Sequence, residues 1–179
     1  GVDWTMASIA AEELGRADIS LAIPVLYLVE AAWGFIFSKY GTKEAKEKYL
    51  PKITSGDAFC GIAVTEPEGG SDILGAAKTK AEKKDKNWII NGEKIFISGI
   101  TESSKWGGIH LTLARTDPSK GHKGFSFFAV TLKDNPNVET TLFEDMGRMG
   151  ISTGGFKMTD VELPDEYLIG DLNHGFYYA

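Results

Sequence analysis

The hydrophobic pattern of this chain changes period once, near residue 57, and that change constrains the fold more than any other feature. Before it, apolar residues recur every three or four positions, which is the period of an amphipathic helix. After it, short runs alternate between apolar and polar residues and are separated by Gly, Asn and Asp, as β-strands are. The sequence therefore predicts an α+β chain, with an all-helical segment followed by strands.

Three helices are expected in the first segment, and each has a polar residue at its start. Asp3 is placed to cap the first, and Asp18 or Ser20 the second, because short polar side chains accept hydrogen bonds from the free amides of a helix N-terminus. Thr42 is placed to cap the third, and Pro51 is expected to follow its end.

Eight short strands are expected in the second segment, and their number and spacing suggest a barrel or a sandwich. Asn91-Gly92 predicts a hairpin between two of them, because a type I′ turn needs positive φ at both central positions. A bulge is expected near Thr159-Asp160, where the apolar side chains of the last strand change faces.

Charge and cysteine content narrow the function. The formal net charge of -6 argues against nucleic acid or an anionic membrane as partner, since phosphate binding needs clustered Lys and Arg. The lysine-rich residues 78–87 suit either a basic patch or a solvated edge strand, and the interleaved acids favour the strand. Cys60 is alone, so it has no internal disulfide partner, and a reducing, cytoplasmic location is expected.

Residues 19–37 come near the length and apolar character of a membrane span. Pro24, Glu30 and Gly34 interrupt the run, so a pair of buried core helices is the better interpretation. The chain starts at Gly1 without a signal-peptide pattern, and we expect it to be a piece of a longer protein.

Several common catalytic and binding motifs are missing from the sequence. The three histidines have no metal-ligand spacing with each other or with the cysteine, and no G-x-S-x-G elbow occurs. Neither a Walker A sequence nor a G-x-G-x-x-G after a strand is found. No metal is expected, and any cofactor must be held in another way.

The first candidate site is the turn over residues 63–72, which reads AVTEPEGGSD. Thr65 would present its hydroxyl at a strand end, where it could bond the edge of a heterocycle. Gly70 would let the backbone approach a bulky group, and Ser71 adds a hydroxyl, which together suit a phosphate if the three acids point away. A plain surface turn explains the same residues.

The second candidate site is the strand that ends at Ser98. Alternation places Ile95 and Ile97 on one face, and Phe96 and Ser98 on the other. An aromatic ring beside a hydroxyl can stack on a planar ring and hydrogen-bond one of its heteroatoms. A hydrophobic strand with one polar end is the alternative. With Thr65, these residues would line one flat pocket on a sheet.

Four blocks of the sequence resemble the acyl-CoA dehydrogenase family, in the order and at the spacing of that family. They are YGTKEAKEKYLPKITSGD (40–57), VTEPEGGSD (64–72), NWIINGEKIFISG (87–99) and DMGRMGISTGGFKMTDVELPDEYLIG (145–170). The resemblance implies a partial helical domain over 1–57 and a middle domain over 58–170 that is an antiparallel β-barrel. It also implies the start of a C-terminal helical domain over 171–179, with its helical bundle absent.

The resemblance also implies a FAD site. It places the hydroxyl of Thr65 near the pyrimidine edge of the flavin, Ser71 near phosphate and along the acyl-CoA path, and Ser98 close to N5, the atom that accepts hydride. The family usually has Trp and Thr where this chain has Phe96 and Ser98. The cofactor-binding residues expected are Ile62, Val64, Thr65, Gly70, Ser71, Phe96, Ile97 and Ser98.

The activity implied by the resemblance is α,β-dehydrogenation of an acyl-CoA thioester, with hydride passing to the flavin. The base would be a glutamate of the C-terminal bundle, so no catalytic residue is expected among these 179 and the chain alone should be inactive. The expected electron acceptor is an electron transfer flavoprotein. The full-length protein is expected to be a homotetramer. Its expected location is the cytoplasm, or the mitochondrial matrix in a eukaryote. The alternatives are a flavin monooxygenase or nitroalkane oxidase of the same fold, or a non-catalytic alkylation-response relative associated with DNA.

Overall fold

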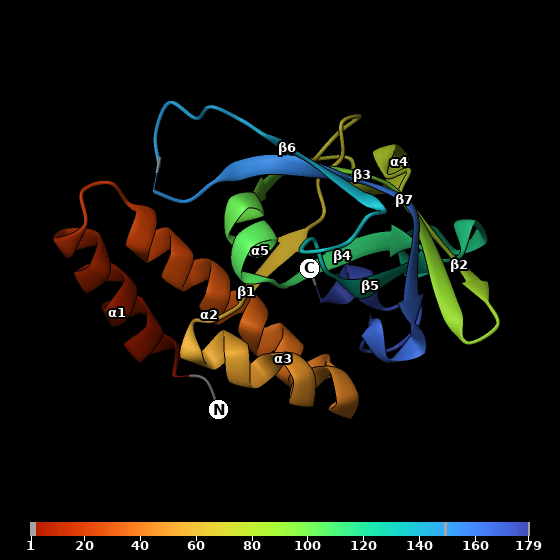
Figure 1. The fold of residues 1–179 in the computed structure, drawn as a ribbon, viewed down its shortest axis with the longest axis horizontal. Coiled ribbons are helices and arrows are strands. Elements are labelled where there is room, and N and C mark those ends of the chain that lie inside the picture. The colour runs from red at the N-terminus through yellow and green to blue at the C-terminus, as the bar shows by residue number, and fades with distance from the viewer. Residues whose placement is uncertain (1–2, 149, 179) are drawn as a thin grey trace.

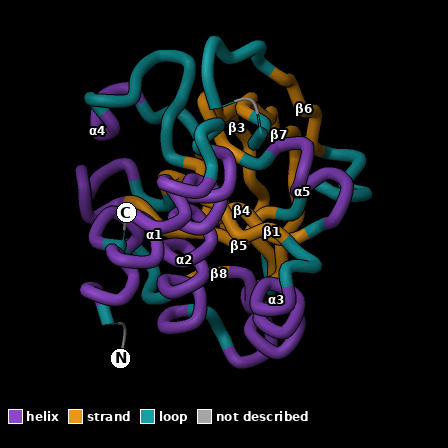
Figure 2. The backbone as a smooth tube through the Cα atoms, turned by 90° about the vertical axis from the view of Figure 1, so that its left-hand side faces the viewer, coloured by secondary structure: helices purple, strands orange, loops and turns teal. Residues whose placement is uncertain are grey.

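The computed structural model describes residues 3–148 and 150–178. Figure 1 shows the N-terminal helices gathered on one side and the strands on the other. The same division is visible from the helical side in Figure 2, where the helices lie in front of the sheet. The α+β class predicted from the change of period is confirmed.

Three α-helices come first: α1 (Trp4–Ala17), α2 (Ala22–Tyr40) and α3 (Lys43–Ser55). The caps predicted at Asp3 and Thr42 are confirmed, since the side chain of each accepts hydrogen bonds from amides of the first turn. The prediction that Pro51 follows α3 is wrong. Pro51 lies inside the helix, which ends only where Gly56 adopts φ 82, a left-handed conformation that glycine tolerates.

The two candidate caps of α2 both contribute, although neither occupies the cap position. That position is held by Leu21, with φ 60. The Asp18 carboxylate accepts from the Ile23 N–H at 2.8 Å, and the Ser20 hydroxyl accepts from the Ala22 N–H at 3.3 Å. The free amides at the helix start are thus satisfied by the turn that precedes it.

Among the described residues, α2 is the one helix whose length and composition would allow it to cross a membrane. The pair of buried core helices predicted over residues 19–37 is wrong, because one helix, α2, spans almost all of this segment. Pro24 and Phe37 are buried, whereas Ile23 and Leu28 are more than half exposed. The helix is therefore only partly covered by the rest of the chain.

Eight strands follow: β1 (Phe59–Ala63), β2 (Lys80–Lys84), β3 (Asn87–Ser98), β4 (Gly108–Arg115), β5 (Phe125–Val130), β6 (Val138–Leu142), β7 (Thr153–Pro164) and β8 (Leu168–Ile169). Short helices α4 (Ile73–Ala76) and α5 (Ile100–Trp106) lie between them. The 3-10 turns span Pro118–Gly124, Asp165–Tyr167 and Gly175–Tyr177. The last turn stands where the start of an apolar helix was expected.

The strands form one mixed sheet in the order β6-β7-β3-β2-β4-β5-β8, with β1 beside β4. β1 runs parallel to β4, as does the single pair that joins β2 to β4, so the prediction of a purely antiparallel barrel is wrong. Parallel neighbours need a long connection, and the chain between β1 and β4 supplies one. Within the described residues no pairing joins β6 to β8, so the sheet is not a closed barrel by its hydrogen bonds.

The hairpin predicted at Asn91-Gly92 is wrong, because β3 runs straight through it and pairs with β7 on both sides. The actual two-residue turn is Asp85-Lys86, between β2 and β3. Gly92 serves a close approach instead: a Cβ on it would lie 2.6 Å from the Cα of Thr79.

The bulge predicted near Thr159-Asp160 is confirmed. The register between β3 and β7 shifts there, and Asp160 has φ 53. The side chain of Asn91 fills the irregularity, donating to the Asp160 carboxylate at 2.9 Å and accepting from the Asp160 N–H at 2.8 Å. An Asn-Gly pair that resembles a turn is thus used to support a bulge.

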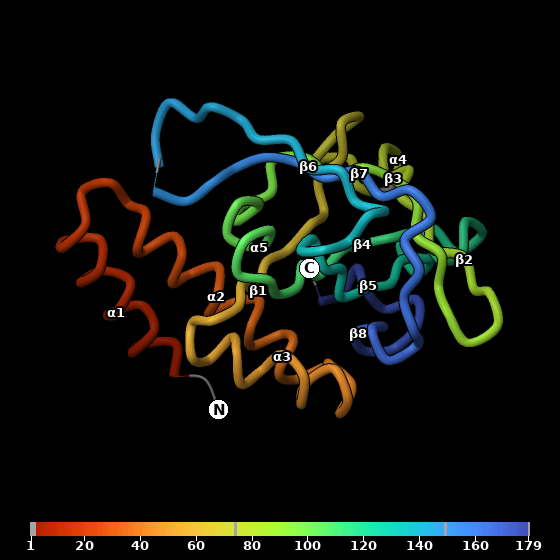
Figure 3. The backbone as a smooth tube through the Cα atoms, in the orientation of Figure 1, coloured from red at the N-terminus to blue at the C-terminus, as the bar shows by residue number. Residues whose placement is uncertain are grey.

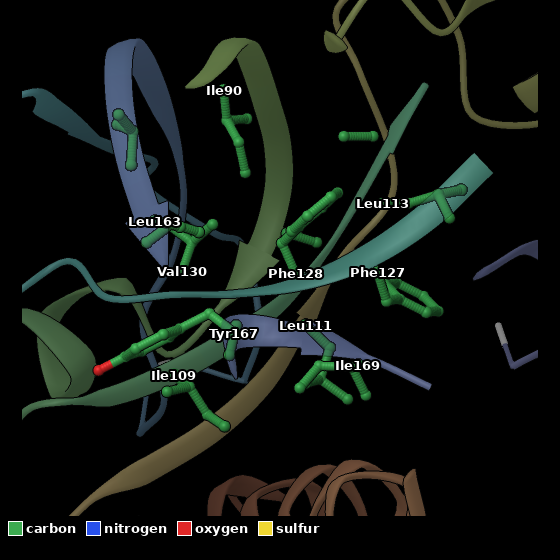
Figure 4. Packing of buried hydrophobic residues seen from close by; sticks show 14 of the residues in the cluster. Ile90, Ile109, Leu111, Leu113, Phe127, Phe128, Val130, Leu163, Tyr167 and Ile169 are labelled. Atoms are coloured by element: carbon green, nitrogen blue, oxygen red, sulfur yellow. The ribbon is translucent and has the colours of Figure 1, made fainter. Parts of the chain in front are cut away.

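The core lies mainly around β4 and β5. Figure 4 shows Ile90 of β3 on the same side of β5 as Phe128 and Val130, whereas Phe127 points to the other side, as do Leu111 and Ile169. β5 is buried along its whole length, and α2 and α3 cover the sheet at β1 and β4. β2 is the opposite case, since four of its five residues are exposed, as expected for a solvated strand rich in lysine.

The β6–β7 connection reaches across to the helical side. Figure 3 shows this loop running towards the connection between α1 and α2. Gly150 touches the start of α2 so closely that a Cβ on it would clash with the Cβ of Ala22. The same loop carries Arg148, which donates to the hydroxyl of Ser98 at the end of β3, so the loop contacts both α2 and the candidate site.

Candidate functional site

The structure brings the two predicted segments side by side. The chain leaves β1 at Ala63, and the carbonyl of Thr65 accepts a hydrogen bond of 3.0 Å from the N–H of Ile95, the residue before Phe96. Ile62 and Val64 are partly buried on the same stretch. The residues that were predicted to form two walls of one site are thus neighbours, and their binding of flavin stays a prediction.

Gly70 of the turn packs closely against Thr65. A Cβ on Gly70 would lie 3.2 Å from the methyl carbon of Thr65, so a larger residue at position 70 would press against the threonine side chain. Ser71 is exposed at the tip of the loop. Beyond it, the Asp72 carboxylate accepts from the Gly75 N–H at 2.9 Å and caps the short helix α4.

The three acids of the turn have different surroundings. Asp72 is used as the helix cap, and Glu68 pairs with Lys78 at 2.6 Å on the surface. Glu66 is only 2% exposed and contacts Lys94, which is fully buried, with 2.6 Å between Nζ and Oε1. Glu66 therefore points into the protein, away from the exposed end of the loop.

Sequence reasoning missed Lys94, although a signal was present. In β3, Trp88, Ile90 and Lys94 all face inwards. A lysine in register with buried apolar residues requires a buried partner, because an unpaired ammonium group in the interior is very costly. Burial lowers the pKa of Lys94 to about 8 against the opposing attraction of Glu66, which leaves the ammonium charged at neutral pH.

The end of β3 differs from the alternation expected of it. Phe96 has φ 56, and the register with β7 shifts between Ile95 and Ile97, so Phe96 is the extra residue of a bulge. The prediction that Ile95 and Ile97 share one face, and Phe96 and Ser98 the other, is wrong for this reason. Ile97 is buried, Ile95 and Ser98 are partly exposed, and Phe96 is 66% exposed.

An aromatic and polar surface surrounds the bulge. The ring of Phe96 meets that of Phe143 edge-on, with 5.5 Å between centroids. Arg148, from the β6–β7 loop, donates to the Ser98 hydroxyl at 3.1 Å and to the Thr153 hydroxyl at 2.5 Å. Because the oxygen of Ser98 accepts from Arg148, its own proton is available for a further acceptor. Arg148 was missed in the sequence, where it lies in the last of the four blocks.

Two hollows flank these residues. One, of about 490 Å³, lies beside the turn and is lined by Glu66, Pro67, Glu68, Lys78, Asn91, Gly92, Glu93, Lys157, Met158 and Thr159. The other, of about 470 Å³, is lined by Leu142, Phe143, Glu144, Asp145, Ile151, Ser152 and Thr153. Thr65, Phe96 and Ser98 line neither hollow; Phe96 is exposed, and the other two are partly exposed.

The residues present fit a flavin in their chemistry. An exposed aromatic ring offers a stacking surface, a serine hydroxyl has a free proton, and a glycine-containing loop with a terminal hydroxyl stands close by. His110 is an unsuitable base here, since complete burial lowers its pKa to about 3 and its Nε2 is 2.9 Å from the Ser103 hydroxyl. Within the described ranges, no cluster of His, Cys, Asp and Glu is arranged to hold a metal.

Comparison with known protein families gives matches along most of the chain. The family profile described as "Acyl-CoA dehydrogenase, middle domain" matches residues 61–161, and "Acyl-CoA dehydrogenase, N-terminal domain" matches residues 1–57. The glutaryl-CoA dehydrogenase of Desulfococcus multivorans is 30% identical over 96% of this chain and 43% of its own length. An acyl-CoA dehydrogenase of Bacillus subtilis is 35% identical over the whole chain and 46% of its own length.

Solved structures agree with these matches. A glutaryl-coenzyme A dehydrogenase in complex with glutaryl-CoA superimposes with a TM-score of 0.86 and 29% identity, over 95% of this chain and 42% of its own. An acyl-CoA dehydrogenase from Geobacillus kaustophilus gives 0.84 and 30%, over 99% and 45%. The chain thus spans less than half the length of these relatives. With the middle-domain profile alone matching more than half of its residues, the chain belongs to the acyl-CoA dehydrogenase family.

Proposed function

We propose that the protein is part of a FAD-dependent enzyme that dehydrogenates an acyl-CoA thioester between its α and β carbons. The observation that carries this proposal is the juxtaposition of Thr65 and the β3 bulge, which puts an exposed aromatic ring and a serine hydroxyl beside the glycine-containing turn. Membership of a family whose relatives are named as CoA-thioester dehydrogenases supports it. PigA, which shares the fold, was solved with FAD and proline.

Each residue then has a defined role in holding the cofactor. FAD supplies the hydride acceptor when bound. Phe96 would stack on the ring, Thr65 would bond its pyrimidine edge, and Ser71 would serve the phosphate side. Ser98 would donate its hydroxyl proton towards the ring, because Arg148 already donates to its oxygen.

The α-proton of the substrate needs a carboxylate base, and the acids of the turn are poorly suited to that task. Glu66 is committed to Lys94, and Asp72 caps a helix. We infer that the base comes from a C-terminal helical domain, as the greater length of the relatives allows.

The electron acceptor we propose is an electron transfer flavoprotein. A solved structure described as the electron transferring flavoprotein of Acidaminococcus fermentans supports this choice, since a chain in it superimposes with a TM-score of 0.83 and 30% identity. We also propose that the full-length protein assembles as a homotetramer.

The decisive experiment is a visible absorption spectrum of the purified protein after reconstitution with FAD. A bound flavin should give a yellow protein, and anaerobic addition of acyl-CoAs of different length to the full-length enzyme should bleach it. No flavin uptake would overturn the proposal. The 179-residue chain alone should not turn over any acyl-CoA.

Substitution of Phe96 tests the role of the bulge. Phe96→Ala should weaken FAD binding about threefold to tenfold, because a lost aromatic stack is worth roughly 0.5–1.5 kcal/mol, and should leave thermal stability unchanged. Trp106→Ala is the matched control, since Trp106 is 54% exposed and comes from α5. Equal FAD affinity in both variants would contradict the stacking role.

One alternative activity has a specific observation in its favour. The structure of AnaB, a prolyl acyl carrier protein oxidase, superimposes with a TM-score of 0.74 and 29% identity over 82% of this chain. An enzyme of that class would pass its electrons to oxygen. Oxygen consumption at the rate of substrate oxidation, measured with the full-length enzyme, would favour an oxidase over a dehydrogenase.

A further inference from the structure

Glu66 and Lys94 form an ion pair that is almost completely buried, directly beneath the proposed flavin loop. Their side chains are 2% and 0% exposed. Two charges taken out of water gain little net stability from each other, because the loss of hydration offsets most of their attraction. Such a pair is better suited to fixing one geometry than to stabilising the fold, and its other contacts indicate which geometry that is.

Lys94 ties β3, near the bulge at its end, to the residues that follow β1. Besides the carboxylate, its ammonium donates to the carbonyl of Val64 at 3.1 Å. The N–H of the next residue, Ile95, donates to the carbonyl of Thr65 at 3.0 Å. Two consecutive residues of β3 therefore hold the two residues that directly follow β1, which sets the spacing between the two proposed walls of the site.

Glu66 closes the loop that carries Ser71. Its carboxylate accepts from the N–H of Lys78 at 2.5 Å and from that of Thr79 at 3.1 Å. The loop over residues 67–77 therefore starts next to Glu66 and returns to the carboxylate of the same residue. Its backbone also pairs with Gly69 across the first turn of the loop. A loop with ends held together in this way has few conformations open to it.

Close packing surrounds the pair. Thr79 lies against Gly92, where a Cβ would be 2.6 Å from the Cα of the threonine, and Gly92 is two residues from Lys94 in β3. The closed end of the loop thus rests on the strand that holds the lysine. The loop, the strand and the ion pair form one unit.

We propose that Glu66 and Lys94 are positioning residues for the cofactor: their buried pair fixes the loop over residues 67–77, with Ser71, against the Phe96–Ser98 end of β3. This inference rests on the proposed function. Neither residue needs to touch FAD, because both act through the backbone of Val64, Thr65 and the loop.

Two variants test the proposal. Glu66→Gln combined with Lys94→Met removes both charges but keeps an amide oxygen for the N–H groups of Lys78 and Thr79, so no charge is left buried alone. Glu66→Asp keeps both charges but shortens the acid by one methylene, so that it reaches the lysine or the loop amides, not both. Both variants should raise the Kd for FAD at least tenfold and change the visible circular dichroism of the bound flavin. Their far-ultraviolet spectra should match that of the unchanged protein.

The exposed pair Lys83–Asp165 provides a matched control. It joins β2 to the turn after β7, and its side chains are 38% and 56% exposed. Lys83→Met combined with Asp165→Asn also removes one positive and one negative charge, but from a partly exposed pair. The Kd for FAD should change less than twofold in this variant.

The outcomes separate the two proposals. If the unchanged protein takes up FAD and both folded variants bind it with unchanged Kd and an unchanged visible spectrum, the positioning role is overturned and the proposed function stands. If the unchanged protein takes up no FAD, the proposed function fails and the positioning role with it. Should the double variant fail to fold, Glu66→Asp, which retains both charges, decides.

Discussion

Two carboxylates hold the two ends of β1, and they do so in different ways. At the start of the strand, both oxygens of Glu30 from α2 accept from the single N–H of Cys60, at 3.0 and 3.1 Å. Beyond its end, Glu66 accepts from two amides and has Lys94 as a buried cation. Glu30 thus joins α2 to β1, whereas Glu66 belongs to a local network with Lys94 and the N–H groups of Lys78 and Thr79.

The pKa of Glu30 reflects its burial. Burial raises this pKa to about 7, and the hydrogen bond from Cys60 only partly opposes that effect. The protonation of Glu30 therefore changes near neutral pH, and the contact between α2 and β1 should respond to pH.

Removal of the cation from the Glu66 network should have the largest effect. Lys94→Met leaves the carboxylate buried beside an apolar side chain, which typically costs about 3–5 kcal/mol. Urea unfolding at pH 7 measures the loss. The control is Lys83→Met, which removes a lysine from a partly exposed pair in the same sheet. Equal destabilisation by the two substitutions would show that burial of the pair is unimportant.

Glu30 should give a smaller effect that depends on pH. Its pKa in the folded chain is about 7, above the value of 4.5 for an unperturbed glutamate, so unfolding releases a proton between these pH values. The stability from this group is fully present below pH 4.5 and is lost as pH rises through 7. Glu30→Gln keeps an acceptor for Cys60 and does not titrate.

The variant should therefore match the unchanged protein at pH 4.5 and exceed it at pH 8. We expect a gain of about 1–2 kcal/mol, smaller than the full shift implies because water reaches part of the carboxyl. Urea unfolding at both pH values is the measurement, with Glu13→Gln on the exposed side of α1 as control. A stability difference that is the same at both pH values would contradict the assignment.

The sequence predicted those features whose causes are local. The caps at Asp3 and Thr42 need only the next few residues, and the bulge at Asp160 follows from a change of parity within one strand. The blocks around Thr65 and Ser98 were also found, because the family resemblance preserves their order. Their adjacency then followed from the fold.

Features that depend on distant parts of the chain were missed. Asn91-Gly92 has the composition of a hairpin turn, but Asp160 and Thr79 determine its conformation from elsewhere in the sequence. The pair of Lys94 with Glu66 joins residues 28 positions apart, and nothing local identifies the partner. The bulge at Phe96 reversed the predicted faces because one extra residue shifts every later side chain.

The smallest effect is expected for Glu68, another acid of the turn, which pairs with Lys78 at the surface. The hydrogen bond from Lys78 lowers the pKa of Glu68, but both side chains remain largely in water and their attraction is screened. Glu68→Gln should therefore shift Tm by no more than about 2 °C at low salt and less at high salt, measured by differential scanning calorimetry. Glu66 lies two residues earlier in the same turn and differs from Glu68 chiefly in its burial and its partners. A Tm loss in Glu68→Gln as large as that in Lys94→Met would mean that the charge of the turn, and not the burial of one acid, governs its stability.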